Sequence, residues 1–145
     1  MIWGYAPDLI AQTENPLVAQ ADREQGPDAL MRRAAYALAH HTHLALSGAY
    51  ADVSVTPVPR GRRCVLVLVG AGNNGGDGLY GAAYLRRRGY PVAVLPTSKH
   101  IHERGAAAAR RAGVEFWPSV LPETVGEALH ALKAWKPVAI IDAVS

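Results

Sequence analysis

The sequence has little of what defines several protein classes. It contains one cysteine, Cys64, so it cannot form a disulfide framework, and nothing in it requires an oxidising compartment. No apolar run approaches the roughly 18 residues of a membrane-spanning helix. The first residues also lack the basic start and apolar core of a signal peptide. We therefore expect a cytoplasmic protein without a membrane partner.

The sequence also has few charged residues and only a small excess of positive charge. Only 19% of the residues are charged, and the formal net charge is +3. The arginines form groups at residues 60–63 and 86–88, and neither group is interleaved with the aromatic side chains that a nucleic-acid surface uses. The second group coincides with an expected helix end, where cations complement the helix dipole. We therefore expect no nucleic-acid partner.

The apolar pattern that remains is typical of one globular domain. Half of the 145 residues are hydrophobic, which is enough for a core and too many for a disordered chain. Asn15 and Pro16 predict the start of a first helix, and Pro27 and Asp28 the start of a second. In the second helix the expected apolar stripe consists of Leu30, Ala34, Leu38, His41 and Ala45.

Strands and helices alternate after these two helices. Continuous apolar runs predict buried strands at residues 64–69, 91–95 and 138–142, with a short strand at 114–117. Helical patterns occupy residues 79–88, 103–112 and 122–135. The order predicts an α/β three-layer, Rossmann-like fold with a mostly parallel sheet, preceded by two helices.

A glycine-rich segment follows the first expected strand. Gly70, Gly72 and Gly75 match the spacing G-x-G-x-x-G between a strand and a helix, where backbone amides can approach a pyrophosphate. An ordinary dinucleotide site would also have an acidic residue after the second strand, but that segment ends at Lys99 without one. A conventional NAD-dependent oxidoreductase is therefore disfavoured.

Side-chain oxygens set this segment apart from a phosphate loop. Asn73, Asn74 and Asp77 supply amide and carboxylate oxygens, which suit a hard cation or a polyhydroxy ligand. The simpler interpretation is that Asp77 caps the next helix and the asparagines tolerate left-handed backbone. Five glycines, two asparagines and an aspartate within nine residues are more than a turn requires.

Three motifs carry a resemblance to a known family. The string VGAGNNGGDG at residues 69–78 resembles the signature of the YjeF N-terminal family, the NAD(P)H-hydrate epimerases. LMRRAAYALA at 30–39 is similar to a stretch of that family's early helix, with Ala35 where the family usually has glycine. IIDAVS at 140–145 is similar to the strand that leads into the family's second glycine-rich loop.

The resemblance implies a function and a site. The activity would be interconversion of the R and S epimers of hydrated NADH and NADPH, which repairs damaged nucleotides. The potassium ion that the family binds would be held by Asn74 and Asp142. The residues that the resemblance assigns to substrate binding are Asn73, Asn74, Gly75, Gly76 and Asp77.

The expected topology supports the pairing of Asn74 with Asp142. In a Rossmann-like order the strand after the crossover lies beside the first strand. The strands that end at residues 69 and 142 would therefore finish at the same edge of the sheet. Asp142 would then face the segment that contains Asn74. The alternative is that Asp142 only caps the end of its strand.

The family pattern continues beyond residue 145. We therefore treat residues 1–145 as one YjeF N-terminal-like domain that is truncated at its C-terminal end, and we assign no catalytic residue. We expect a homo-oligomer, with a fused dehydratase domain as a further possible partner beyond residue 145. The alternative from another class is a non-catalytic, Rossmann-like binding or scaffold domain.

Overall fold

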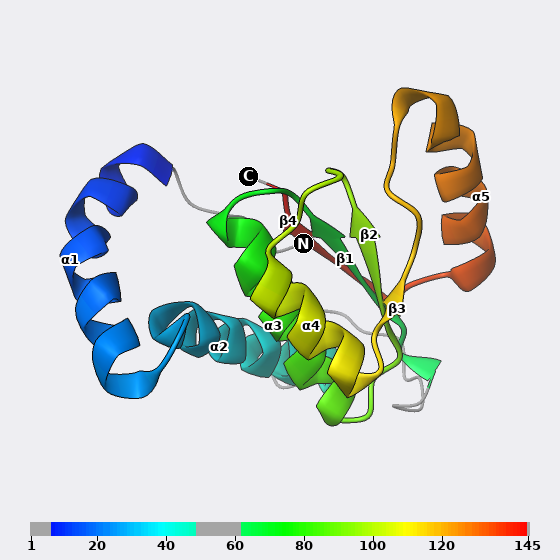
Figure 1. Cartoon of the computed structure of the whole chain (residues 1–145). Helices are drawn as coiled ribbons and strands as arrows, with labels where there is room; N and C mark the ends of the chain where they lie inside the picture. Colours follow the sequence, from blue (N-terminus) through cyan, green and yellow to red (C-terminus); the bar gives the residue numbers. More distant parts are fainter. Residues whose placement is uncertain (1–6, 49–61, 145) are drawn as a thin grey trace.

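The computed structural model describes residues 7–48 and 62–144, so Ser145 of the last motif lies outside the described residues. Helices and strands alternate after two N-terminal helices, as the sequence predicts (Figure 1). The elements are α1 Pro7–Gln25, α2 Ala29–Leu46, β1 Val65–Val69, α3 Asn73–Arg87, β2 Val92–Pro96, α4 Glu103–Ala112, β3 Glu115–Phe116, the 3₁₀ helix η2 Pro122–Thr124, α5 Val125–Trp135 and β4 Ala139–Ala143.

The four described strands form one parallel sheet in the order β3-β2-β1-β4. Helices α3 and α4 lie on one face with α2 packed against α3, and α5 lies on the opposite side (Figure 1). The α/β three-layer prediction with two leading helices is confirmed. The prediction that the last strand lies beside the first is also confirmed, because Leu68 of β1 pairs with Asp142 of β4.

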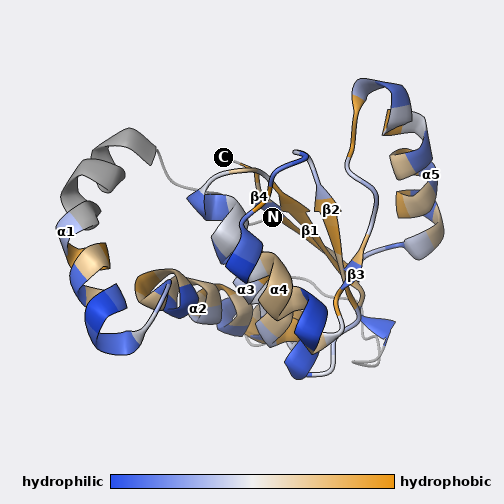
Figure 2. Cartoon of the chain, viewed as in Figure 1, coloured by the Kyte–Doolittle hydropathy of each residue, from blue (hydrophilic) through white to orange (hydrophobic). Residues whose placement is uncertain are grey.

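Alternate residues of β1 build the two halves of the core. Val65, Val67 and Val69 pack toward Leu79 and other residues of the helix-covered face. Leu66 faces the other side, where the cluster includes Trp117, which directly follows β3, and Trp135 of α5. Figure 2 shows the hydrophobic strands between the helical layers. Within the described ranges, no helix is long and apolar enough to cross a membrane.

Two predictions about the leading helices are wrong in detail. Helix α1 begins at Pro7 and not after Asn15, so Pro16 lies inside the helix. Proline inside a helix removes one backbone hydrogen bond. This helix continues through it.

Four of the five buried residues of α2 lie one position after the expected ones. The buried residues are Ala29, Ala35, Ala39, Thr42 and Leu46, while Leu38 of the expected stripe is half-buried and packs against the core. The reason is the close approach of α2 to α3, where a Cβ added to Gly81 would lie 3.7 Å from the backbone oxygen of Ala35. At such a contact small side chains are buried first, so size outweighs hydrophobicity in placing the interface.

Candidate functional site

The glycine-rich segment is the beginning of a helix. Helix α3 begins at Asn73, six residues before the predicted start at Leu79, and Gly72 is its N-cap residue. The expectation of a loop through Gly78 is therefore wrong. Glycine has a low helix propensity, so the sequence pattern alone favours a loop. Tertiary packing of these turns overrides that preference.

The glycines let the first turns of α3 lie directly on the sheet. A Cβ added to Gly75 would lie 2.1 Å from the carbonyl oxygen of Gly70, and one added to Gly78 would lie 2.6 Å from Ala143 Cβ. A Cβ on Gly70 would overlap the carbonyl oxygen of Val144. A side chain at Gly75 or Gly78 would push α3 away from the sheet, and one at Gly70 would separate the ends of β1 and β4.

This close packing places the start of α3 at the topological switch point of the sheet. The chain runs from β1 outward to β2 and β3 and then crosses to β4 on the other side of β1. Ligands of open α/β sheets bind at the carboxyl ends of the strands at such a point. The first backbone N–H groups of a helix have no partner within the helix, so they are available to a ligand there.

The predicted substrate residues differ in exposure along these turns. Asn73 is exposed, and Asn74 and Asp77 are half-buried. Gly75 and Gly76 are buried. The side-chain oxygens that a ligand can reach therefore belong to the asparagines and the aspartate. The glycines let the helix backbone lie close to the sheet.

Asp142 lies at the same edge of the sheet. Its Oδ1 accepts a hydrogen bond of 3.1 Å from the backbone N–H of Val144. The side chain of Ala143 points toward Gly78 of α3. Because successive side chains of a strand point to opposite faces of the sheet, Asp142 lies on the other face, together with Ile140. The end of β4 still touches the start of the β1–α3 connection, since Gly70 N–H donates to Ala143 O at 3.0 Å.

The donor chemistry at this edge fits a hard cation. Asn74 offers an amide oxygen and half-buried Asp142 a carboxylate, which are ligand types that hard cations prefer. In the part of the chain that the structure describes, no three His, Cys, Asp or Glu side chains are grouped so that they could hold a metal ion. The joint Asn74–Asp142 site stays a prediction.

A second polar cluster lies beside these turns, at the junction of α2, α3 and α4. Asp28 is only 9% exposed, and its carboxylate accepts three hydrogen bonds from two side chains. Arg104 donates from Nε to Oδ2 at 2.8 Å and from Nη2 to Oδ1 at 3.1 Å, and the Tyr80 hydroxyl donates to Oδ2 at 2.8 Å. His102 Nε2 lies 3.6 Å from Oδ1. The cluster fixes the three helices relative to one another.

These contacts shift two pKa values in opposite directions. Hydrogen bonds from Arg104 lower the pKa of Asp28 to about 2, against the opposing effect of burial. Burial, together with the hydrogen bond to Asp28, raises the pKa of Tyr80 to about 12. At neutral pH the carboxylate is therefore ionised and the phenol is protonated, which is the state in which the phenol can donate.

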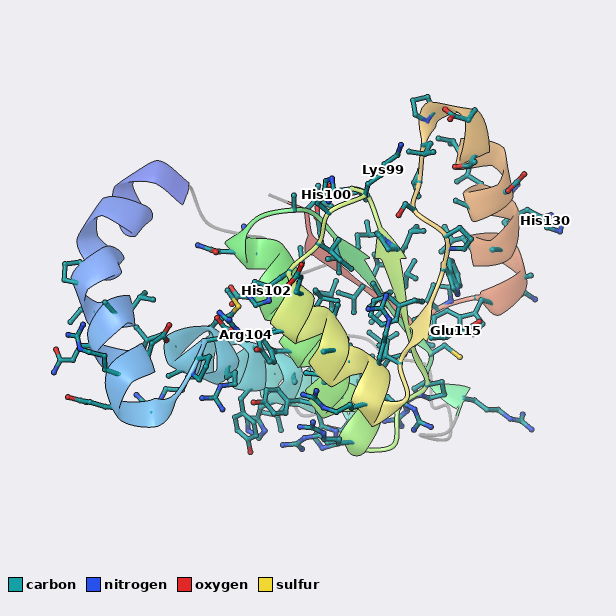
Figure 3. All side chains as sticks on the ribbon, in the orientation of Figure 1. Lys99, His100, His102, Arg104, Glu115 and His130 are labelled. Atoms are coloured by element: carbon teal, nitrogen blue, oxygen red, sulfur yellow. The ribbon has the colours of Figure 1, made fainter. Side chains whose placement is uncertain are left out.

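His102 connects this cluster to the start of α3. Its Nδ1 accepts a hydrogen bond of 3.0 Å from Gly105 N–H, which caps α4. Nε2 faces Asp28, so the neutral ring carries its proton on Nε2. A Cβ added to Gly76 would lie 3.2 Å from His102 Cγ. Figure 3 shows His102 and Arg104 at the start of α4, where it meets α2 and α3.

Sequence reasoning missed this cluster. The sequence pattern predicts Asp28 only as the start of a helix, and nothing in it links Asp28 to Tyr80 or Arg104, which lie 52 and 76 residues away. An Asp at a helix start normally caps that helix, and only the structure shows that the Asp28 side chain does not.

Replacing Tyr80 by phenylalanine is expected to lower the free energy of unfolding by about 1.5 kcal/mol, because it removes a buried hydrogen bond to a carboxylate and retains the ring. Urea unfolding at neutral pH followed by circular dichroism measures the change. Tyr36→Phe is the matched control, since Tyr36 is 53% exposed. An equal loss in both variants would contradict the role given to the Tyr80 hydroxyl.

Comparisons with known proteins agree with this arrangement. A family model described as YjeF-related protein N-terminus matches residues 27–145. The chain is 45% identical over 112 residues to the NAD(P)H-hydrate epimerase of Clavibacter michiganensis subsp. michiganensis, covering 77% of this chain and 40% of the relative. It is 39% identical over 122 residues to the bifunctional NAD(P)H-hydrate repair enzyme Nnr of Mycobacterium tuberculosis strain H37Rv, covering 83% of this chain and 23% of the relative.

A solved structure has the same architecture. The crystal structure of yeast ynu0, YNL200c, superposes with a TM-score of 0.58 and 27% sequence identity, covering 90% of this chain and 54% of the yeast chain. This chain therefore spans less than half the length of these two curated relatives and about half of the yeast chain. The family model covers most of the chain, including the first turns of α3 and strand β4, and the chain belongs to the YjeF N-terminal family.

Proposed function

We propose that this chain provides the nucleotide-binding part of an NAD(P)H-hydrate epimerase, which interconverts the R and S forms of hydrated NADH and NADPH. The observation that carries the proposal is the start of α3, packed by its glycines onto β1 and β4 at the switch point of the sheet. The relatives named NAD(P)H-hydrate epimerase support the same assignment.

The substrate would lie across the first turn of α3. Backbone N–H groups at Asn73, Asn74 and Gly75 and the positive end of the helix dipole would attract the pyrophosphate. Lys99 and His100 lie on the β2–α4 connection, beyond the carboxyl end of β2 (Figure 3). The exposed Lys99 adds positive charge there. Asp77 would bind the polar groups of the ligand, and no residue of this chain is assigned as the acid or base.

A potassium ion at Asn74 and Asp142 is part of the proposal. The ion would supply positive charge beside the pyrophosphate. The half-buried Asp142 would hold it through the carboxylate oxygen that does not accept the Val144 N–H bond. The repair enzymes named bifunctional among the relatives also support a second, fused activity in the same repair process.

The test is binding of ADP-ribose measured by titration, together with epimer interconversion measured by chromatography, each with potassium or choline as the cation at equal ionic strength. We expect Asn74→Ala and Asp142→Ala each to weaken binding of ADP-ribose by about tenfold, which corresponds to about 1.4 kcal/mol. In both variants, binding and interconversion should no longer differ between potassium and choline. Glu127→Ala, at an exposed position on α5, is the control and should behave as the unaltered chain.

Two results would contradict parts of this proposal. Absence of saturable binding of ADP-ribose would reject the nucleotide site and favour a scaffold domain. Unchanged potassium dependence in Asp142→Ala would reject the cation site alone.

A further inference from the structure

A basic pocket lies between the α1–α2 turn, α3 and α4, away from the start of α3. Its volume is about 430 Å³, which is within the range of small-molecule sites. Tyr80 lies in its wall, seven residues after Asn73, or about 10 Å along the helix axis. The lining residues are Gln25, Gly26, Pro27, Arg32, Tyr80, Arg104, Ala107 and Arg111.

Three arginines line this pocket, and no acidic residue is among the lining residues. Asp28 forms an ion pair with Arg104 and offsets that one charge. Arg32 donates from Nη2 to the backbone oxygen of Gln25 at 2.9 Å, and its buried Nε has no hydrogen-bond partner among the described residues. Within the same part of the chain, the exposed Arg111 has no ion-pair partner.

The excess positive charge therefore belongs to Arg32 and Arg111. These residues come from different helices, α2 and α4, and the tertiary fold brings both to one concave surface. The hydrogen bonds between Arg104 and Asp28 hold the start of α4 against that of α2. The two helices that carry these charges are thus fixed relative to each other, which lowers the entropy cost of binding an anion.

We propose that this pocket binds a phosphorylated small molecule, with the phosphoryl groups between Arg32 and Arg111. The planar guanidinium group matches phosphate oxygens with paired hydrogen bonds. Pro27 and Ala107 provide apolar surface for the rest of the ligand. The only lining aromatic ring, Tyr80, is 7% exposed, so the pocket offers little of the stacking surface that a single-stranded nucleic acid would need.

The test uses inorganic pyrophosphate as the probe, titrated into the ¹⁵N-labelled chain at constant ionic strength. We expect saturable shifts of the amide signals of Gly26, Ala107 and Arg111. Arg111→Gln is expected to weaken this binding at least tenfold. Arg87→Gln removes the same charge at an exposed position on α3 and is expected to change the affinity less than twofold. Because Arg32 also bonds the α1–α2 turn, Arg32→Gln is interpreted only if its unfolding midpoint is unchanged.

The outcome separates this pocket from the proposed nucleotide site. Shifts confined to residues 72–76 would overturn the pocket and leave the nucleotide site standing. An equal loss in Arg87→Gln and Arg111→Gln would also overturn it, because the binding would then reflect only the overall charge. Saturable shifts of pocket residues, without any binding of ADP-ribose, would support the phosphate-binding pocket and contradict the proposed nucleotide site.

Discussion

Replacing Gly75 by alanine is expected to lower the free energy of unfolding by at least about 3 kcal/mol, or to prevent folding. The added Cβ would lie 2.1 Å from the carbonyl oxygen of Gly70, a backbone atom that cannot rotate away. To relieve the overlap, either α3 must move off the sheet or the β1–α3 connection must move. Either movement displaces the backbone N–H groups at the start of α3, so ligand binding there should be lost as well.

The neighbouring Gly72 provides a matched control. It is the N-cap residue of α3 with φ −87°, and a Cβ added there meets nothing within 4 Å. Alanine is a poorer N-cap than glycine, so Gly72→Ala should cost less than about 1 kcal/mol. Urea unfolding of both variants measures the difference. Similar stabilities for the two variants would show that the close approach of Gly75 to the sheet is not required.

The fold could be predicted largely from the sequence because apolar periodicity and helix-ending residues are local signals. Helix α4 begins and ends as predicted, and Gly113 ends it in the left-handed conformation, with φ 94°. Two of the errors occur where packing decides. The start of α3 depends on glycines, which a helix-propensity scale scores as unfavourable. The buried face of α2 depends on alanines that let α2 approach α3, which a hydropathy pattern does not select.

Part of the candidate site could also be predicted from the sequence, and part could not. The position of Asp142 beside β1 follows from the order of strands and crossovers, so it could be predicted. The Asp28 cluster could not, because its partners come from three helices that are far apart in sequence. Contacts of this kind depend on the relative position of helices, which is set by packing and not by any local pattern.

Replacing Asp28 by asparagine is expected to lower the free energy of unfolding at neutral pH by about 2 kcal/mol, the value of a pKa shift of this size. The lowered pKa, about 2 against an ordinary 3.8, shows that the folded protein favours the ionised form. Asparagine has a similar shape and also tolerates the left-handed backbone, φ 61°, that Asp28 adopts. The substitution therefore removes the charge that Arg104 and Tyr80 bind and preserves the local geometry.

The dependence of this loss on pH distinguishes the charge from a packing defect. A carboxyl group whose pKa is lowered on folding stabilises the protein fully above its unfolded pKa and loses this effect as the pH falls through the folded value. The difference in free energy of unfolding between the unaltered chain and Asp28→Asn should therefore be constant above about pH 5. It should decrease to a few tenths of a kcal/mol near pH 2. Glu115→Gln, at an exposed position on β3, is the control, with an expected change below about 0.5 kcal/mol. Urea unfolding at a series of pH values measures all three chains, and a gap for Asp28→Asn that stays constant down to pH 2 would reject the ionic role of Asp28.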